Sequence, residues 1–211
     1  GEIHPYWIHR EVPERALITN MGHQVVSSHR GECHFGLTPG GCTDHPGVWE
    51  RMSAFIEAVG KQYASAPNLV GWDAWNELRW DVQADGLVCY CDHTIAAFRK
   101  WLEEKHGSLG GLNKAWNRRY SCWEDVVPGK TFNRPYTEMM AFAHFLTMRS
   151  CKHSADRYKV LKEVDPDHPV TVHGGQPSPE QAAGQDSTAL NRGNDWYHAE
   201  NCDGIGCSSF P

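Results

Sequence analysis

Three short apolar runs are separated by long stretches of helical periodicity, and this spacing limits the fold more than any other feature of the sequence. The runs cover residues 68–76, 169–173 and 203–209. Strands spaced so widely by helices cannot form hairpins, so they should pair in parallel through right-handed crossovers. An open sheet of three strands would leave both of its edges uncovered. The sequence therefore predicts an α/β fold that is part of a parallel barrel, with further strands before residue 1 and after residue 211.

Helical periodicity fills four stretches around these runs. The predicted helices cover residues 46–63, the stretch from Asp92 or Thr94 to Gly107, residues 109–116 and residues 136–164. Asp44 is the expected cap of the first helix, Pro46 lies in its first turn, and Gly107 ends the second helix. Residues 1–45 show no sustained period, so they are predicted to form a long loop with a brief strand at residues 24–26.

Charge and hydropathy exclude several classes of protein. The net charge is −6, with acids and bases interspersed, which argues against a nucleic-acid or membrane-surface partner and permits a neutral ligand. No run approaches the ~20 apolar residues of a membrane span. No signal peptide is visible, so a cytoplasmic location is expected. The nine tryptophans favour a sugar ligand, because flat indole rings stack on pyranose faces, although most of them are expected in the core.

The first apolar run ends on an amide and a carboxyl group side by side, Asn76 and Glu77. In a parallel α/β barrel the chemistry gathers at the C-terminal ends of the strands. The three nearest tryptophans are Trp72, Trp75 and Trp80. Such surroundings should raise the pKa of Glu77, and a carboxylic acid of raised pKa can protonate a glycosidic oxygen. The alternative is that Asn76 and Glu77 merely cap the strand, with Glu77 in solvent.

Several stretches together resemble the glycoside hydrolase family 42 β-galactosidases. The segment APNLVGWDAWNE is similar to the acid/base strand of that family, and CYCDHTIAAFRKWLEEKHGSLGGLNKAWNRRY follows it in the family's order. PYWIHREVPE and TDHPGVWERM resemble the loop after the third strand and the next helix, and HPVTVHGG and CDGIGCSSFP resemble the fifth and sixth strands. The resemblance implies a partial (β/α)8 TIM barrel. Residues 1–211 would be a fragment of one catalytic domain, from after the third strand to the sixth.

The resemblance also implies a function, the retaining hydrolysis of terminal β-linked sugars. Glu77 looks like the general acid/base, and Asn76 looks like the residue that holds the sugar 2-hydroxyl. Arg30 and Trp75 are the expected further contacts with the substrate, although Arg30 is equally explained as a surface charge. His173, at the end of a strand, is either another substrate contact or a histidine satisfied within the barrel mouth.

The second carboxylate of a retaining enzyme is not evident in the sequence. It should lie about 5 Å from the first, and in this family it is on the seventh strand. The later strands here end in His173-Gly174-Gly175 and Ser208-Ser209, so the nucleophile is expected outside this chain. Ser121 replaces an aromatic of the family pattern, which leaves the preference for galactose open. The alternatives are another β-glycosidase of the clan, such as an endoglucanase or mannanase, or a non-catalytic carbohydrate-binding remnant.

Family members often carry a structural zinc on four cysteines, and three of these positions are matched here. The matching residues are Cys42, Cys89 and Cys91. Thr94 stands at the fourth position, whereas a structural zinc site normally has four protein ligands. His93 or Cys33 would then have to complete the site, or the cysteines are free thiols. No cofactor is expected in catalysis, and the resemblance implies a homo-oligomer such as a trimer.

Overall fold

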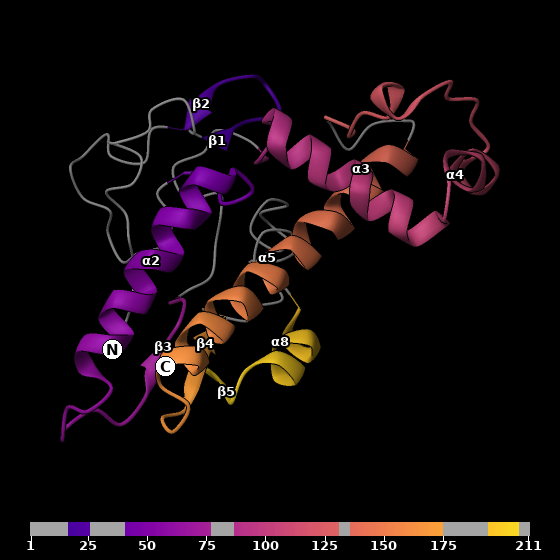
Figure 1. Ribbon diagram of the computed structural model, residues 1–211. Helices are drawn as coiled ribbons and strands as arrows, with labels where there is room; N and C mark the ends of the chain where they lie inside the picture. The colour runs from indigo at the N-terminus through magenta and orange to yellow at the C-terminus, as the bar shows by residue number, and fades with distance from the viewer. Residues whose placement is uncertain (1–16, 26–40, 77–86, 131–135, 175–193, 207–211) are drawn as a thin grey trace, which may run out of the picture.

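A parallel sheet of three strands lies at one end of the molecule (Figure 1). The computed structural model describes residues 17–25, 41–76, 87–130, 136–174 and 194–206. The strands are β3 (Trp72–Asp73), β4 (Val170–His173) and β5 (Gly204–Gly206). They pair in this order, and both pairs are parallel. The predicted parallel sheet with helical crossovers is therefore confirmed.

The strand β3 is shorter than predicted, although its hydrogen bonds to β4 continue beyond it. The bonds run from Trp72 N to Pro169 O, from Ala74 N to Thr171 O and from His173 N to Trp75 O, at 2.9, 2.9 and 3.0 Å. The start of the predicted run does not belong to the sheet, because Val70 is 86% exposed. Gly71 allows the chain to approach β4 closely, since a Cβ atom there would lie 2.9 Å from the carbonyl oxygen of Pro169.

The four predicted helices are present, and two shorter ones accompany them. The helices are α2 (Pro46–Tyr63), α3 (Asp92–His106), α4 (Leu109–Trp116), η3 (Trp123–Asp125, a 3-10 helix), α5 (Tyr136–Val164) and α8 (Asp195–Asn201). Gly107 ends α3 in the left-handed conformation, with φ of 75°, as predicted. Among the described residues, no helix unites the length and the apolar character that a bilayer crossing requires.

The predicted caps of α2 and α3 are wrong. His45, not Asp44, precedes α2, and its Nδ1 accepts a hydrogen bond from the backbone N–H of Gly47 at 3.1 Å. The helix α3 begins after Cys91, whose side chain makes no capping hydrogen bond. Asp44 and Thr94 bind each other instead, at 2.6 Å. Both side chains are therefore turned toward a buried network and away from the helix ends.

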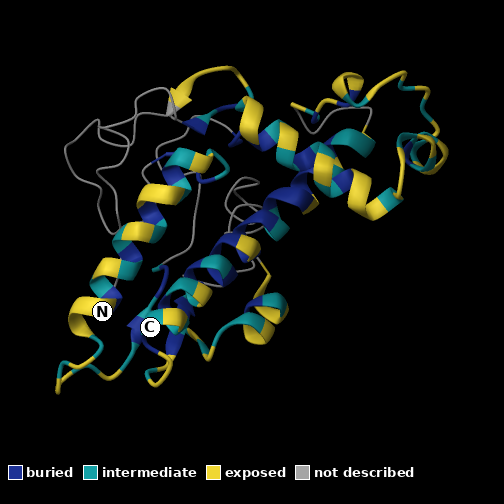
Figure 2. Cartoon of the chain, in the orientation of Figure 1, coloured by how far each residue is buried: buried dark blue, intermediate teal, exposed yellow. Residues whose placement is uncertain are grey.

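The long helix α5 passes through two hydrophobic cores (Figure 1). Near its C-terminal end, Leu161 packs against α2 and the sheet, with Met52, Ile56, Trp72 and Val170. Near its N-terminal end, Phe142, Phe145 and Leu146 pack against Phe98 and Leu102 of α3 and Leu112 of α4. Figure 2 shows α5 largely buried along its middle, whereas α3 and α4 keep an exposed face. Met140 of the same helix is exposed.

A short antiparallel hairpin lies outside the parallel sheet. It consists of β1 (Leu17–Ile18) and β2 (Gln24–Val25), of which only the second was predicted. The hydroxyl of Thr19 accepts hydrogen bonds from the backbone N–H groups of Met21 and His23, and Gly22 has φ of +86°. Most of the predicted N-terminal loop lies outside the described residues.

Candidate active site

Two polar side chains meet at the C-terminal ends of neighbouring strands. Asn76 comes shortly after β3, and His173 is the last residue of β4. Nδ1 of His173 lies 2.5 Å from Oδ1 of Asn76, and both residues are partly buried. In a β/α barrel this is the edge where catalytic groups gather. The structure thus places Asn76 where a substrate-binding residue was expected, beside a histidine from the next strand.

Two of the predicted site residues lie outside the described part of the chain. These are Glu77, the expected acid/base, and Arg30, an expected sugar contact. Their roles, and the raised pKa expected for Glu77, stay predictions. Glu77 is nevertheless the next residue after Asn76, so it follows directly on the strand end described above.

The structure corrects the interpretation of two tryptophans. Trp75, an expected sugar contact, is fully buried in a core with Leu17, Val88 and Val172, so its indole offers no surface to a ligand. Trp72 points to the opposite end of the sheet, where its Nε1 donates a hydrogen bond to Asp165 at 2.8 Å. Both side chains therefore belong to hydrophobic cores, Trp72 to the one beside α2 and α5 and Trp75 to the one with β1 and β4.

A buried arginine supports the end of β3 from the side of α5. Nη1 of Arg157 donates to the carbonyl oxygen of Ala74 at 3.0 Å, and its guanidinium carbon lies 4.1 Å from the ring centroid of Trp75. Burial lowers the pKa of Arg157 to about 9, so the group stays charged near neutral pH. A desolvated cation over an indole face is a favourable contact. Arg157 therefore fixes the two residues that precede Asn76.

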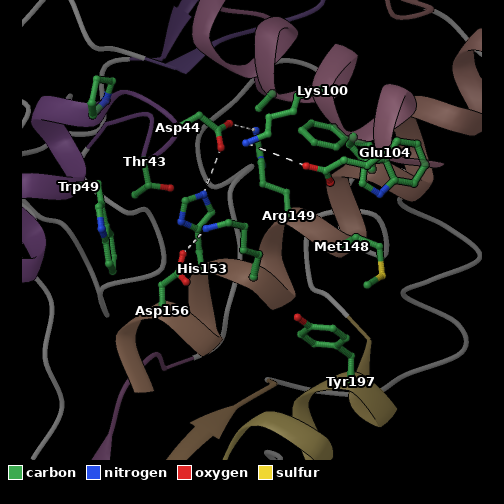
Figure 3. A pocket seen from close by; sticks show the side chains of 15 residues that line it. Thr43, Asp44, Trp49, Lys100, Glu104, Met148, Arg149, His153, Asp156 and Tyr197 are labelled. Atoms are coloured by element: carbon green, nitrogen blue, oxygen red, sulfur yellow. Dashed lines mark hydrogen bonds and ion pairs between the residues drawn. The ribbon is translucent and has the colours of Figure 1, made fainter. Parts of the chain in front are cut away.

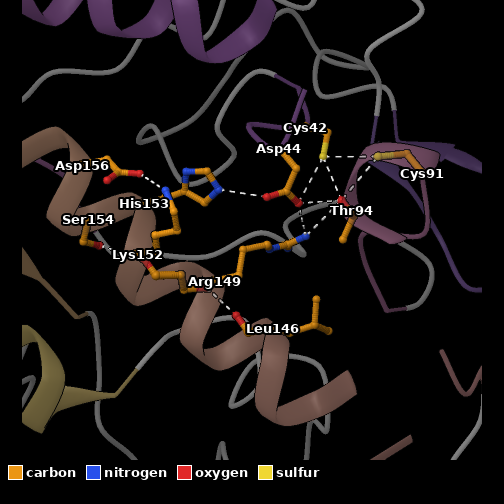
Figure 4. A network of polar contacts seen from close by, with 11 residues as sticks. Cys42, Asp44, Cys91, Thr94, Leu146, Arg149, Lys152, His153, Ser154 and Asp156 are labelled. Atoms are coloured by element: carbon orange, nitrogen blue, oxygen red, sulfur yellow. Dashed lines mark hydrogen bonds and ion pairs between the residues drawn. The ribbon is translucent and has the colours of Figure 1, made fainter. Parts of the chain in front are cut away.

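The three predicted zinc ligands lie together. Sulfur atoms of Cys42, Cys89 and Cys91 are all within 4.8 Å of one another, and those of Cys42 and Cys91 are 3.5 Å apart (Figure 4). Burial raises the pKa of Cys42, and it raises that of Cys89 to about 11. Hydrogen bonding with the other two cysteines lowers the pKa of Cys91. The cluster therefore brings together the segment that precedes α2 and the segment that precedes α3.

The fourth position beside these sulfurs is taken by Thr94. Its hydroxyl oxygen lies 3.1 Å from Sγ of Cys42 and 3.4 Å from Sγ of Cys91. A neutral hydroxyl is not among the common ligands of zinc, so the donor set fits zinc at three positions and departs from it at the fourth. The ring of His93 packs edge-on against His45, with centroids 4.2 Å apart. Cys33 lies outside the described residues.

Asp44 links the cysteine cluster to the middle of α5 (Figure 4). Its carboxylate lies 3.1 Å from Nη1 of Arg149 and 3.1 Å from Nε2 of His153. Burial opposes the ionisation of Asp44, but Arg149 and His153 outweigh it and hold the pKa of this carboxyl well below its usual range. Burial lowers the pKa of His153, although its contact with Asp44 opposes this shift. Sequence reasoning missed this network, whose only signal is two basic residues four apart on an otherwise apolar helix face.

A pocket of about 500 Å³ lies beside this network, between α2, α3, α5 and α8 (Figure 3). Trp49, Trp101 and Tyr197 contribute aromatic side chains to its lining, and Arg149 and His153 contribute polar ones. All of its lining residues lie on these helices or immediately before α2. The pocket is therefore separate from the strand ends that carry Asn76 and His173.

The fold and the site define a class of protein. Parallel strands joined by helices, with polar residues at their C-terminal edge, are the arrangement of a β/α-barrel enzyme. The family model described as beta-galactosidase, that of glycoside hydrolase family 42, matches residues 2–199. The chain belongs to this family.

Individual relatives agree with this assignment. Beta-galactosidase bgaB of Geobacillus kaustophilus is 27% identical over 177 residues, which are 80% of this chain and 24% of the relative. A solved beta-galactosidase from Halorubrum lacusprofundi superposes with a TM-score of 0.75 at 23% identity, covering 98% of this chain and 29% of that one. One from Bacillus circulans gives a TM-score of 0.74 at 21% identity, covering 99% and 29%. The chain thus spans about a quarter of the length of the curated relatives, and the predicted partial TIM barrel is confirmed.

Proposed function

We infer that the protein carrying this chain is a retaining glycoside hydrolase of the β-galactosidase type, which cleaves terminal β-linked sugars. The single observation that supports this most is the position of Asn76 at the C-terminal end of β3, with Glu77 next in the chain. Membership in a family described as beta-galactosidase gives the reaction class. A carbohydrate is accordingly the proposed substrate.

The mechanism follows the double displacement of retaining enzymes. Glu77 protonates the leaving glycosidic oxygen while a second carboxylate attacks the anomeric carbon, and Glu77 then removes a proton from the water that releases the sugar. The amide of Asn76 donates a hydrogen bond to the sugar 2-hydroxyl. That bond strengthens as positive charge develops at the anomeric carbon, so it stabilises the transition state more than the ground state.

The attacking carboxylate is proposed to lie on a part of the barrel beyond these residues. The chain spans about a quarter of the length of its curated relatives, which supports this placement. Asp203 is not a suitable candidate, because it lies at the start of β5. Its carboxylate accepts a hydrogen bond from the backbone N–H of Val170 at 2.9 Å and pairs with Lys162 at 2.8 Å, at the end of the sheet opposite to Asn76.

A structural zinc belongs to the proposal but takes no part in the chemistry. Cys42, Cys89 and Cys91 would hold it, and Thr94 adjoins the fourth position. A metal there would join the segment before α2 to the turn before α3. Assembly into a homo-oligomer is a further part of the proposal, and light scattering on the purified protein measures it directly.

A second candidate is a related β-glycosidase that acts on another sugar. The observation in its favour is that an exo-carrageenase of family 42 from Bacteroides ovatus shares the fold, with a TM-score of 0.63 and 17% identity. Turnover measured on a panel of nitrophenyl β-glycosides and on carrageenan fragments separates the two candidates.

The test of the proposed function is the substitution of Glu77 in the complete protein. Glu77→Ala should lower the hydrolysis of nitrophenyl β-galactoside by about a thousandfold or more, since it removes both proton transfers. Azide should partly restore turnover of this activated substrate by replacing the attacking water. Glu103→Ala, an exposed residue of α3, is the matched control and should keep the wild-type rate. Wild-type turnover in the Glu77→Ala variant would contradict the assignment.

A further inference from the structure

The side chain of His173 is held between the two neighbouring strands of the sheet. Its Nδ1 lies 2.5 Å from Oδ1 of Asn76, which follows β3. On the side of β5, a Cβ atom placed on Gly206 would lie 3.3 Å from Cδ2 of the His173 ring. The glycine thus leaves the imidazole just enough room to lie over β5 while its nitrogen reaches across to Asn76.

The backbones of the two residues are fixed in the same register. The N–H of His173 donates to the carbonyl oxygen of Trp75, the residue before Asn76, at 3.0 Å. The carbonyl oxygen of Ala74 accepts from the buried guanidinium of Arg157 at 3.0 Å. The pairing of β3 with β4 therefore places His173 beside Asn76, so the contact between them follows from the register of the two strands.

The contact assigns both the tautomer of His173 and the orientation of the Asn76 amide. An amide oxygen only accepts hydrogen bonds, so Nδ1 of His173 carries the hydrogen and donates it. With Oδ1 of Asn76 committed to the histidine, the NH₂ group of the same amide must point the other way. An amide rotated by 180° would bring its NH₂ group against the N–H of His173, so it would be satisfied only if the imidazole also moved its hydrogen to Nε2.

We propose that His173 is a positioning residue, which holds the amide of Asn76 with its NH₂ group toward the 2-hydroxyl of the bound sugar. This inference rests on the proposed function. His173 acts through Asn76 in this role. Asn76 needs this support because a terminal amide rotates about its last bond with little preference between its two orientations. Loss of the histidine would leave the amide present without its contact to Nδ1.

The test compares two substrates in the complete protein, nitrophenyl β-galactoside and its 2-deoxy analogue. On the first substrate, His173→Ala should lower kcat/KM by about ten- to hundredfold, as expected when a binding group is misplaced. On the 2-deoxy analogue the same substitution should cost less than about threefold, because the hydroxyl that Asn76 serves is absent. His173→Asn, whose side-chain N–H can replace Nδ1–H, should recover most of the rate on the first substrate.

The matched control is His168→Ala, which removes a histidine at the opposite end of the sheet. His168 contacts Asp165 at 2.8 Å, so its loss should leave the ratio of the two kcat/KM values at the wild-type level. An equal loss on both substrates in His173→Ala, or no loss on the first, would overturn the proposal.

Different results would contradict the proposed function and the role of His173. If the wild-type protein hydrolyses no glycoside, the proposed glycosidase function is wrong. The role of His173 is then decided by crystal structures of the wild type and of His173→Ala. An Asn76 amide rotated or disordered only in the variant supports the positioning role, and an unchanged amide overturns it.

Discussion

The carboxylate of Asp44 lies 3.1 Å from the guanidinium of Arg149, across 105 residues of sequence. The exposed fractions of the two side chains are 7% and 2%. Thr94 donates to the same carboxylate from α3. The contacts of the Asp44 carboxylate thus join the segment before α2, the first turn of α3 and the middle of α5. They lie between the two hydrophobic cores that α5 connects.

Breaking this pair should be costly. Arg149→Met leaves Asp44 buried without its main counter-ion, which typically lowers the free energy of unfolding by about 3–5 kcal/mol. Lys152→Met on the same helix is the matched control, because Lys152 pairs with Asp156 at the surface and such pairs contribute about 0–1 kcal/mol. Urea unfolding of both variants measures the difference, and equal losses would contradict the importance assigned to Asp44.

Completing the cysteine site should strengthen metal binding. Thr94→Cys supplies a fourth thiolate beside Cys42 and Cys91, and four sulfur ligands form a closed zinc site. We expect one zinc per chain in both proteins, retained in Thr94→Cys at chelator concentrations that remove it from the wild type. Elemental analysis after dialysis measures this, with Cys122→Ser at an exposed cysteine as the control. Far less than one equivalent in the wild type would end the zinc proposal.

The contact between Asp165 and Trp72 should make stability depend on pH. Burial opposes ionisation of Asp165, but hydrogen bonds from Trp72 and His168 outweigh it and lower the pKa of Asp165 below its usual value. A lowered carboxyl pKa stabilises the folded state above the unfolded pKa, and this stability is lost as the pH falls through the folded pKa. The free energy of unfolding between pH 6 and pH 3 should therefore fall less steeply in Asp165→Asn. An identical slope would contradict the argument.

Two glycine substitutions should have opposite effects. At Gly71 a Cβ atom would lie 2.9 Å from the carbonyl oxygen of Pro169, so Gly71→Ala must push β3 away from β4 and should cost about 1–3 kcal/mol. At Gly110, inside α4, the nearest atom is the Ser108 hydroxyl at 3.8 Å, so Gly110→Ala should stabilise by about 0.5–1 kcal/mol. Thermal unfolding compares the two, and a tolerated Gly71→Ala would show that the strands can separate freely.

The 211-residue chain alone should not turn over nitrophenyl β-galactoside. The proposed mechanism needs a second carboxylate about 5 Å from Glu77, and that group is placed outside these residues. A sensitive fluorogenic galactoside assay of the separate chain and of the complete protein makes the comparison. Activity in the separate chain that disappears in Glu77→Ala would require a nucleophile within it.

Local signals predicted the elements well. The spacing of apolar residues identified α2, α3, α4 and α5, and Gly107 marked the end of α3, because periodicity and a left-handed cap are properties of short segments. The parallel order of β3, β4 and β5 followed from the length of the connections between them. The cysteine cluster was predicted from the resemblance to family 42, whose zinc-binding positions are matched by Cys42, Cys89 and Cys91.

The rest depends on contacts between distant residues, which single-sequence patterns do not encode. Asp44 has the sequence pattern of a helix cap, yet its partner is Arg149 on a helix far along the chain. Trp75 was expected to touch a sugar, whereas Arg157 and the core bury it. His173 was noted for its position at the end of a strand, but its partner was not predicted, because only the register of β3 and β4 brings it to Asn76.

A single uninterrupted α5 is shared by both hydrophobic cores, so a loss of packing in one core should weaken the other through this helix. Amide exchange along residues 136–164 should then rise in both halves of the helix when either core is destabilised. A substitution that interrupts the middle of α5 should turn one cooperative unit into two that unfold separately.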